Sequence, residues 1–340
     1  MAVKIEYKYS DIKKPMQPEN ISVDGLYDYA DYASLLFEYS INLFRKKFEK
    51  VSGKSCNLFI GPMKDRNRVD EKLNETDIES PSNILDILRA TVTLKTVEDL
   101  LDFLKYTKTF SFTKKDFNSL SLDNDALNSI RKRFEKDVRI KFPGITNVEV
   151  EKKVDDLMKT AVEQLKTNCK NMGELPSTNV AISNSFSLKV DEKQKQKYDF
   201  LSIKPRLKNS NYMDFKFYVC IPIPAFEVGM DEDYIICEVI TTLDCFNDVY
   251  PKTHFLFEKT RSFKSLSDDD ISPEAFNSVL NALSCSMYVD DVITKYNSEH
   301  PDGIQILPHN DNKQVRENLL NSVDSLTVTK ALCDCRNYKR

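Results

Sequence analysis

Glycine is scarce in this chain, and its glycines lie far apart in the sequence. Seven occur among 340 residues, whereas average usage in proteins is about 7%. The phosphate-binding loops of P-loop proteins, dinucleotide-binding folds and protein kinases need several closely spaced glycines, because the backbone approaches the phosphate there. The sequence therefore excludes these classes, and a phosphate bound by this protein must be held by side chains. The glycines are Gly25, Gly53, Gly61, Gly144, Gly173, Gly229 and Gly303.

The charge balance, the N-terminus and the cysteines restrict the compartment and the partners of the chain. The 49 Lys and Arg residues face 53 Asp and Glu residues, and a net charge of −4 argues against bulk nucleic-acid binding. The N-terminus lacks the apolar core of a signal peptide, and the longest apolar run, 218–226, is broken by two prolines. The eight cysteines form no CxxC pair, so neither a zinc site nor a disulfide framework is indicated. We expect a soluble cytoplasmic protein with no membrane partner.

Hydrophobic periodicity, caps and turn residues predict an alternation of helices and strands. Helices are expected at 24–50, from Gly61-Pro62 to about 74, as a short turn at 84–88, and at 97–106, 124–140, 147–170, 272–296 and 312–333. Strands are expected at 57–60, 89–94, 179–183, 186–190, 214–223 and 234–242. This order fits an α+β or α/β domain with a mixed sheet better than a sandwich or a bundle. We assign the chain to the α+β class, with a mixed β-sheet flanked by helices and an inserted helical segment.

The amino-acid composition changes from about 107 to 200, where Ser, Asn, Asp and Lys dominate. We therefore predict a core split between 1–106 and 200–300. Residues 107–199 form an inserted helical segment with short strands, and 301–340 carry a C-terminal helix. The length suits either two domains or one large domain with an insertion.

Three cations recur at intervals of four in the helix expected after Gly61. Lys64, Arg68 and Lys72 share one stripe of that helix, and Arg66 lies on another part of its surface. Like charges one turn apart repel unless something negative lies on them. A bound phosphate is one explanation, and a solvated helix face paired with acidic neighbours is the other.

Two carboxylates accompany these cations. Asp86 and Arg89 lie at the entrance to one strand, and Glu238 interrupts the apolar run of another. A glutamate flanked by apolar residues needs a partner, a cation or solvent. Two carboxylates and a cationic stripe can build a site for a magnesium-bound nucleotide. Each residue taken singly also has a purely structural explanation. Asp86 could be a turn or cap residue, and Glu238 could lie on the solvent-facing side of an antiparallel strand.

Taken in order, these residues resemble the RelA/SpoT-like nucleotidyltransferase superfamily, in particular its stand-alone eukaryotic-type members. The resemblance rests on 61–72 (GPMKDRNRVDEK), 83–93 (NILDILRATVT), 206–209 (RLKN), 211–215 (NYMDF), 238–240 (EVI) and 254–261 (HFLFEKTR). It implies a polymerase-β-type nucleotidyltransferase fold, with a mixed sheet and helices around a nucleotide cleft. It also implies an Mg-dependent transfer of a phosphoryl-containing group from ATP to a hydroxyl of a nucleotide or RNA.

The resemblance also implies roles for individual residues. Lys64, Arg68 and Lys72 would hold the donor phosphates, Asp86 and Glu238 would bind Mg, and Arg89 would steady the transferring phosphoryl group. Tyr212 would stack on the acceptor base, and we place Arg66 and His254 among the nucleotide-binding residues. His254 is also a candidate general base, against the ordinary expectation of a packed or capping histidine.

Four positions depart from the family pattern and keep other functions open. Asn211, Met213, Ile240 and Phe257 stand where the family has Gly, Arg, Gln and Tyr. The alternative is an inactive descendant that serves as a structural or protein-interaction scaffold, with 124–170 and 312–333 as surfaces for a partner or for self-association. A third reading, an RNA-binding module, would use a cluster that acidic neighbours dilute and that no aromatic ladder accompanies. That cluster is Arg131, Lys132, Arg133, Lys136 and Arg139.

Overall fold

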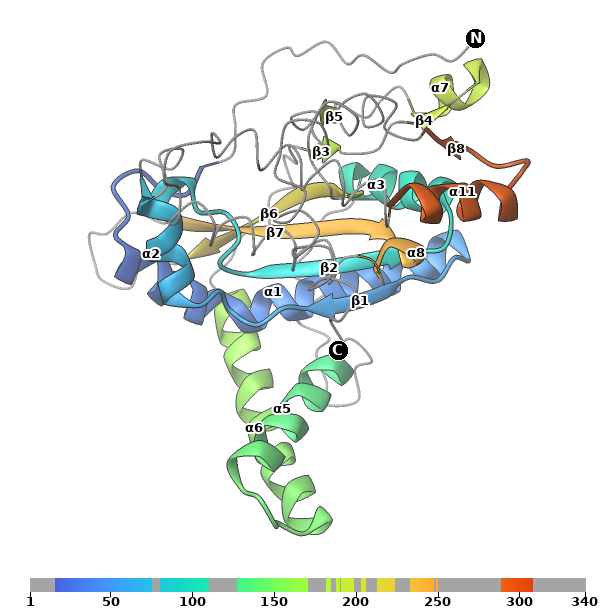
Figure 1. Cartoon of the computed structure of the whole chain (residues 1–340). Coiled ribbons are helices and arrows are strands. Elements are labelled where there is room, and N and C mark those ends of the chain that lie inside the picture. The colour runs from blue at the N-terminus through green and yellow to red at the C-terminus, as the bar shows by residue number, and fades with distance from the viewer. Residues whose placement is uncertain are drawn as a thin grey trace, which may run out of the picture.

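The protein folds around a mixed six-stranded sheet with two helices packed on one face and a two-helix arm projecting from it (Figure 1). The arrangement is α+β, with a mixed sheet flanked by helices, as the sequence predicts. A computed structural model describes residues 16–74, 80–109, 127–170, 182–184, 188–189, 191–198, 203–205, 213–223, 233–247, 249 and 289–307.

The six strands of the sheet lie in the order β1-β2-β7-β6-β3-β5, with both parallel and antiparallel neighbours. The pairs β2–β7 and β3–β5 are parallel, and the pairs β1–β2, β7–β6 and β6–β3 are antiparallel. A second sheet pairs β4 (Leu188–Lys189) with β8 (Gln305–Ile306). The strands of the main sheet are β1 (Asn57–Ile60), β2 (Arg89–Leu94), β3 (Ile182–Asn184), β5 (Ile203–Pro205), β6 (Phe215–Ile223) and β7 (Asp233–Leu243).

Helices α1 (Val23–Ser52) and α3 (Val97–Thr109) cover the apolar face of this sheet. Alternate residues of β6 are buried on that face, and the ring of Phe217 lies near those of Phe44 from α1 and Phe103 from α3. The Phe44 and Phe103 rings themselves meet edge to face at 5.0 Å. This aromatic core fixes the sheet, so the side chains of its other face have a rigid support.

The bounds of α1 follow from its caps. Ser22 Oγ accepts a hydrogen bond from the Gly25 amide at 3.0 Å, and Gly53 ends the helix with a positive φ of 71°. At the start of α3, Thr96 Oγ1 accepts from the Asp99 amide at 3.1 Å. These caps account for both ends of α1 and for the start of α3.

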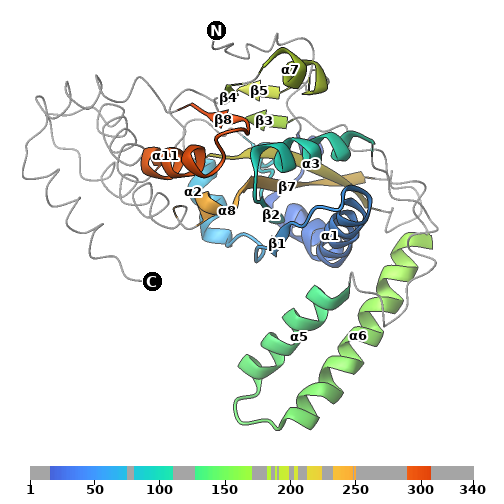
Figure 2. The ribbon, with the colours of Figure 1, turned by 90° about the vertical axis from the view of Figure 1, so that its right-hand side faces the viewer.

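Helices α5 (Asn128–Lys141) and α6 (Asn147–Lys170) form the arm, which extends away from the sheet in both views (Figures 1 and 2). An ion pair of 2.9 Å between Arg133 of α5 and the buried Glu38 of α1 joins the arm to the body. Two further arginines of the basic cluster are also used internally, by Arg131–Asp155 and Arg139–Glu135. Three of the five cations of this cluster thus pair with acidic side chains of the protein itself.

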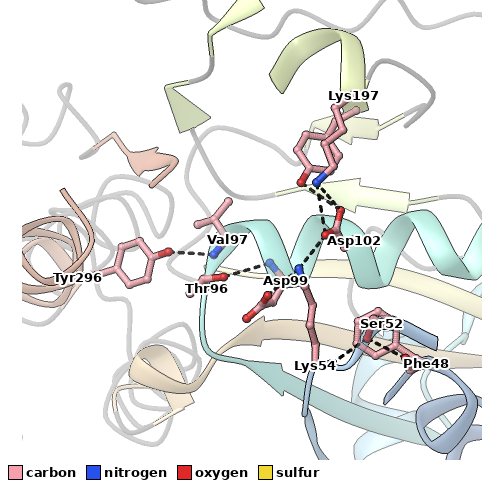
Figure 3. Close-up of polar contacts among 10 residues, drawn as sticks. Phe48, Ser52, Lys54, Thr96, Val97, Asp99, Asp102, Lys197 and Tyr296 are labelled. Atoms are coloured by element: carbon pink, nitrogen blue, oxygen red, sulfur yellow. Dashed lines mark hydrogen bonds and ion pairs between the residues drawn. The ribbon is translucent and has the colours of Figure 1, made fainter. Parts of the chain in front are cut away.

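A network of charged side chains joins α3 to α7 (Glu192–Tyr198) and to the turn after α1 (Figure 3). Asp102 accepts from Lys54 at 2.7 Å and from the Tyr198 hydroxyl at 3.1 Å, and it forms an ion pair of 3.0 Å with Lys197. Burial acts to raise the pKa of Asp102, but the hydrogen bonds from Lys54 and Lys197 outweigh it, so the pKa lies below its ordinary value. Asp102 therefore stays ionised and holds three elements together.

Helix α11 (Asp290–Glu299) packs near this network. The Tyr296 hydroxyl of α11 accepts a hydrogen bond from the Val97 amide at 2.9 Å, at the start of α3 (Figure 3). The short helices are η1 (Pro81–Asn83) and α8 (Asp244–Asn247). No helix in the described part of the chain has both the length and the apolarity to cross a membrane.

Several predicted bounds are wrong. The helix expected from Gly61 begins only at Arg66, as α2 (Arg66–Asn74), and the helical turn expected at 84–88 is non-helical, since η1 ends at Asn83. Helix α7 was not predicted at all. Of the helix expected at 272–296 only the end falls in described residues, as part of α11, and the helix expected at 312–333 lies outside them.

Candidate functional site

Asp86 lies between two lysines. Its Oδ2 atom is 2.5 Å from Lys64 Nζ and 2.9 Å from Lys72 Nζ, and all three side chains are largely buried. One carboxylate thus serves two ammonium groups, which leaves the cluster with an excess positive charge in a partly desolvated place. Such a cluster attracts an anion, because charge-assisted hydrogen bonds are strong where water is scarce.

The lysines converge because the chain bends before α2. The Lys64 amide donates to Ile87 O at 3.0 Å, and the Lys64 carbonyl accepts from the Tyr27 hydroxyl at 2.7 Å. Asp65 Oδ1 then accepts from the Asn67 amide at 2.9 Å, so α2 starts after Lys64. Lys72 reaches Asp86 from the last turn of α2. The two lysines therefore meet through tertiary structure and not through helical spacing.

The predicted stripe of three cations on one helix is accordingly wrong. Arg68 is exposed and forms an ion pair of 2.8 Å with Glu71. Arg66 forms an ion pair of 2.5 Å with Asp24, and its guanidinium lies 5.0 Å from the centre of the Tyr27 ring. The structure brings Lys64 and Lys72 together and directs both arginines into other ion pairs.

The pKa values of the cluster reflect its two cations and one anion. Burial acts to raise the pKa of Asp86, but the charges of Lys72 and Lys64 outweigh it, and the pKa lies below its ordinary value. The pKa of Lys64 is lowered to about 8, chiefly by burial and also by Lys72, although Asp86 opposes the shift. The lowered pKa values of Asp86 and Lys64 are compatible, because Asp86 stays paired with Lys72 when Lys64 loses its proton.

Glu238 is buried on β7 and forms an ion pair of 2.9 Å with Lys216 of β6. The sequence predicts that this glutamate needs a partner, a cation or solvent, and the structure supplies the cation. Lys216 was not among the residues expected in the site, although a lysine between Phe215 and Phe217 in an apolar strand is a usable sequence signal.

The sheet sets Arg89 beside Glu238. The two residues are partners in the parallel pairing of β2 and β7, so their side chains leave the same face of the sheet. The Glu238 amide donates to Leu88 O at 3.0 Å. This face is opposite the one covered by α1 and α3, since Val239 next to Glu238 is buried in the hydrophobic core.

Upstream of this pairing, the buried Gln17 bridges the two chain segments that carry the carboxylates. Its Nε2 donates to Ile84 O at 2.8 Å and to Ile236 O at 2.9 Å, and its Oε1 accepts from the Ile236 amide at 2.8 Å. Asp86 and Glu238 each follow a bridged residue by two positions. Gln17 was missed in the sequence, where nothing distinguishes it from a residue of a polar N-terminal tail.

The rest of the predicted site is only partly described. Tyr212 and His254 lie outside the described residues, as do 206–211. Met213 is buried, and its carbonyl accepts from Thr242 Oγ1 at 2.5 Å, so this position packs in the core and offers no cation. Within the described residues, no group of three or more His, Cys, Asp or Glu side chains is arranged to hold a metal ion.

Comparisons with known proteins add little to this geometry. No protein-family model matches the sequence, and no curated protein matches it. Among solved structures, the chain is similar to a GTP pyrophosphokinase family protein from Streptococcus pneumoniae, with 10% identity and a TM-score of 0.35. The similarity covers 89% of this chain and 100% of that one.

Proposed function

We propose that the protein is an Mg-dependent nucleotidyl or pyrophosphoryl transferase, which moves a phosphoryl-containing group from ATP to a hydroxyl of a nucleotide or RNA. The observation that carries the proposal is the convergence of Lys64 and Lys72 on Asp86, with Arg89 held next to Glu238 on the adjoining strands. The sequence resemblance to RelA/SpoT-like enzymes supplies the type of reaction.

The lysine cluster suits the donor phosphates. Lys64 and Lys72 carry one more positive charge than Asp86 neutralises, and each ammonium can donate three hydrogen bonds. A triphosphate that enters this place replaces water as the acceptor for the donors that Asp86 leaves free. Phosphate is then held by side chains, as the shortage of closely spaced glycines requires.

The two carboxylates fit a magnesium ion in their chemistry. Mg²⁺ prefers carboxylate oxygens, and Asp86 Oδ1 is buried without a hydrogen-bond partner in the described structure. Glu238 offers a second carboxylate from the neighbouring strand. When bound, the ion supplies neutralisation of the charge that develops on the transferring group.

Arg89 is the residue we assign to the transferring phosphoryl group. A guanidinium presents several donors in a fixed plane, which matches phosphate oxygens better than a lysine does. The register places it directly beside Glu238, and Gly61 lies so close that a Cβ there would be 3.0 Å from Arg89 Cγ.

The alternative function, an inactive scaffold, has a specific observation in its favour. Both candidate metal ligands already form ion pairs with lysines, Asp86 with Lys64 and Lys72 and Glu238 with Lys216. A protein that had lost its metal would gain stability from such pairs. In that case the projecting arm of α5 and α6 would be the surface for a partner.

Transfer of label distinguishes the two. The purified protein is incubated with radiolabelled ATP, Mg²⁺ and a panel of GDP, GTP, adenine nucleotides and RNA as acceptors. We expect labelled product with the wild type, loss of at least about 100-fold with Glu238→Gln or Asp86→Asn, and no change with Glu151→Gln, an exposed glutamate on α6. No label above background, or equal label with Glu238→Gln and wild type, would favour the scaffold. Circular dichroism confirms that each variant is folded.

A further inference from the structure

Phe59 is an exposed aromatic residue on the same sheet face as Arg89 and Glu238. The residue is 66% exposed, on the edge strand β1. The register pairs Phe59 with Thr91, Thr91 with Ile240, and Ile240 with Lys216, so these four side chains form one row across the face. Arg89 and Glu238 belong to the adjacent row. An aromatic ring therefore stands open to solvent at the margin of the charged site.

Arg89 also approaches β1 next to Phe59. The Gly61 amide donates to Arg89 O at 2.9 Å, which continues the β1–β2 pairing beyond Ile60. A Cβ at Gly61 would lie 3.0 Å from Arg89 Cγ and 3.1 Å from Arg89 Nε, so the arginine side chain lies over this glycine. Gly61 and Phe59 are two residues apart and face the same side. The guanidinium end of the site and the Phe59 ring are thus neighbours along β1.

We propose that Phe59 is the platform on which the base of a bound nucleotide stacks, with the phosphates extending past Arg89 to Lys64 and Lys72. This proposal rests on the proposed function, since it adds a base-binding residue to the same site. Lys64 lies five positions after Phe59, a span of at most about 18 Å, which an extended nucleoside triphosphate can cover. Stacking on an aromatic side chain contributes roughly 10-fold or more to affinity and tolerates any base.

Stacking of a base would explain why the Phe59 ring is exposed, although such exposure is unfavourable by itself. A large aromatic side chain on an edge strand exposes apolar surface and invites pairing with another chain. A planar base covers such a ring on one side without burying the strand edge. The substrate class is therefore a nucleotide with an intact base, and inorganic polyphosphates lack the group that this residue would recognise.

A tryptophan at this position reports stacking directly, because the chain contains no Trp. Phe59→Trp is titrated with ATP, GTP and inorganic tripolyphosphate in the presence of Mg²⁺. We expect ATP and GTP to quench the emission and tripolyphosphate to leave it unchanged. The matched control is Phe142→Trp on the arm, whose phenylalanine is 39% exposed and whose tryptophan should respond to none of the three.

Affinity gives the second measurement. By calorimetry, Phe59→Ala should weaken ATP binding about 10-fold, Phe59→Tyr should retain it, and tripolyphosphate should bind all three forms equally. Calorimetric ATP binding without quenching in Phe59→Trp, together with unchanged affinity in Phe59→Ala, would overturn the stacking proposal while the transferase remains. Quenching of Phe59→Trp by ATP, without any transfer of label by the wild type, would instead overturn the transferase and leave the stacking proposal standing. Emission that changes with protein concentration and not with nucleotide would assign Phe59 to self-association and overturn the proposal.

Discussion

Lys216 of β6 and Glu238 of β7 form an ion pair across neighbouring strands, with 2.9 Å between Nζ and Oε2. The glutamate side chain is 8% exposed and the lysine 19%. Removing one partner from a buried pair leaves a charge that neither water nor the protein fully compensates. The pair therefore explains how an ionisable residue persists within the apolar sequence of β7.

Lys216→Met should lower the free energy of unfolding by roughly 2 to 4 kcal/mol, whereas Lys132→Met, at an exposed position of the arm, should change it by less than about 0.5 kcal/mol. The double variant Lys216→Met with Glu238→Gln should recover part of the loss. Urea unfolding of the four members of the cycle measures a coupling that we expect to exceed about 1 kcal/mol. Strictly additive effects would show that the pair contributes nothing.

Lys64 should make stability rise with pH in the alkaline range. Its pKa is about 8 in the folded protein and 10.5 in its ordinary state. Between these values the unfolded chain binds the proton and the folded protein does not, so unfolding becomes less favourable as the pH rises. The wild type should gain roughly 2 to 3 kcal/mol relative to Lys64→Met between pH 8 and pH 10.5. A difference that stays constant across urea unfolding curves in this range would contradict the shift.

Gln17→Leu should destabilise the protein by roughly 2 to 4 kcal/mol, because three buried backbone groups of Ile84 and Ile236 lose their partners. Gln164→Leu, at an exposed position of α6, is the matched control and should have almost no effect. Thermal unfolding of both variants measures the difference. Equal melting temperatures would mean that water replaces the amide without cost.

Lys72→Ala and Arg68→Ala should differ in their effect on nucleotide binding. Lys72 faces Asp86 in the cluster, whereas Arg68 is exposed and paired with Glu71. We expect Lys72→Ala to weaken ATP affinity about 10-fold or more, and Arg68→Ala to weaken it less than about 3-fold, because exposed charges contribute little. Calorimetry on the two variants makes the comparison. Similar losses would show that phosphate binding depends on the exposed surface of α2 as much as on the cluster around Asp86.

Local signals in the sequence were sufficient for much of the fold. The ends of α1 follow from Ser22 and Gly53, and the strands β1, β2, β6 and β7 follow from runs of β-branched and aromatic residues. Gly61-Pro62 was misleading, because a proline after a glycine is typical of a helix start. Here the Lys64 amide donates to Ile87 O instead, and the helix begins only after this contact, at Arg66.

The site was less accessible to prediction because its contacts are remote in sequence. That Glu238 needs a partner follows from its apolar neighbours, but Lys216 is identified only by the register of β6 against β7. Lys64, Lys72 and Asp86 were each singled out, yet their meeting at one oxygen depends on the bend before α2. The bond from Gln17 to Ile236 spans 219 positions, and no local pattern encodes it.

The bridge made by Gln17 has a practical consequence. Regular pairing of β2 with β7 begins at Arg89 and Glu238, and before that point a side-chain amide stands between the two segments. The spacing of the acidic groups is thus controlled by an amino acid that belongs to neither strand. A shortened version of the protein that starts after Gln17 would keep every acidic and basic group of the site. It would still lose the side chain that links the segment of Asp86 to the segment of Glu238.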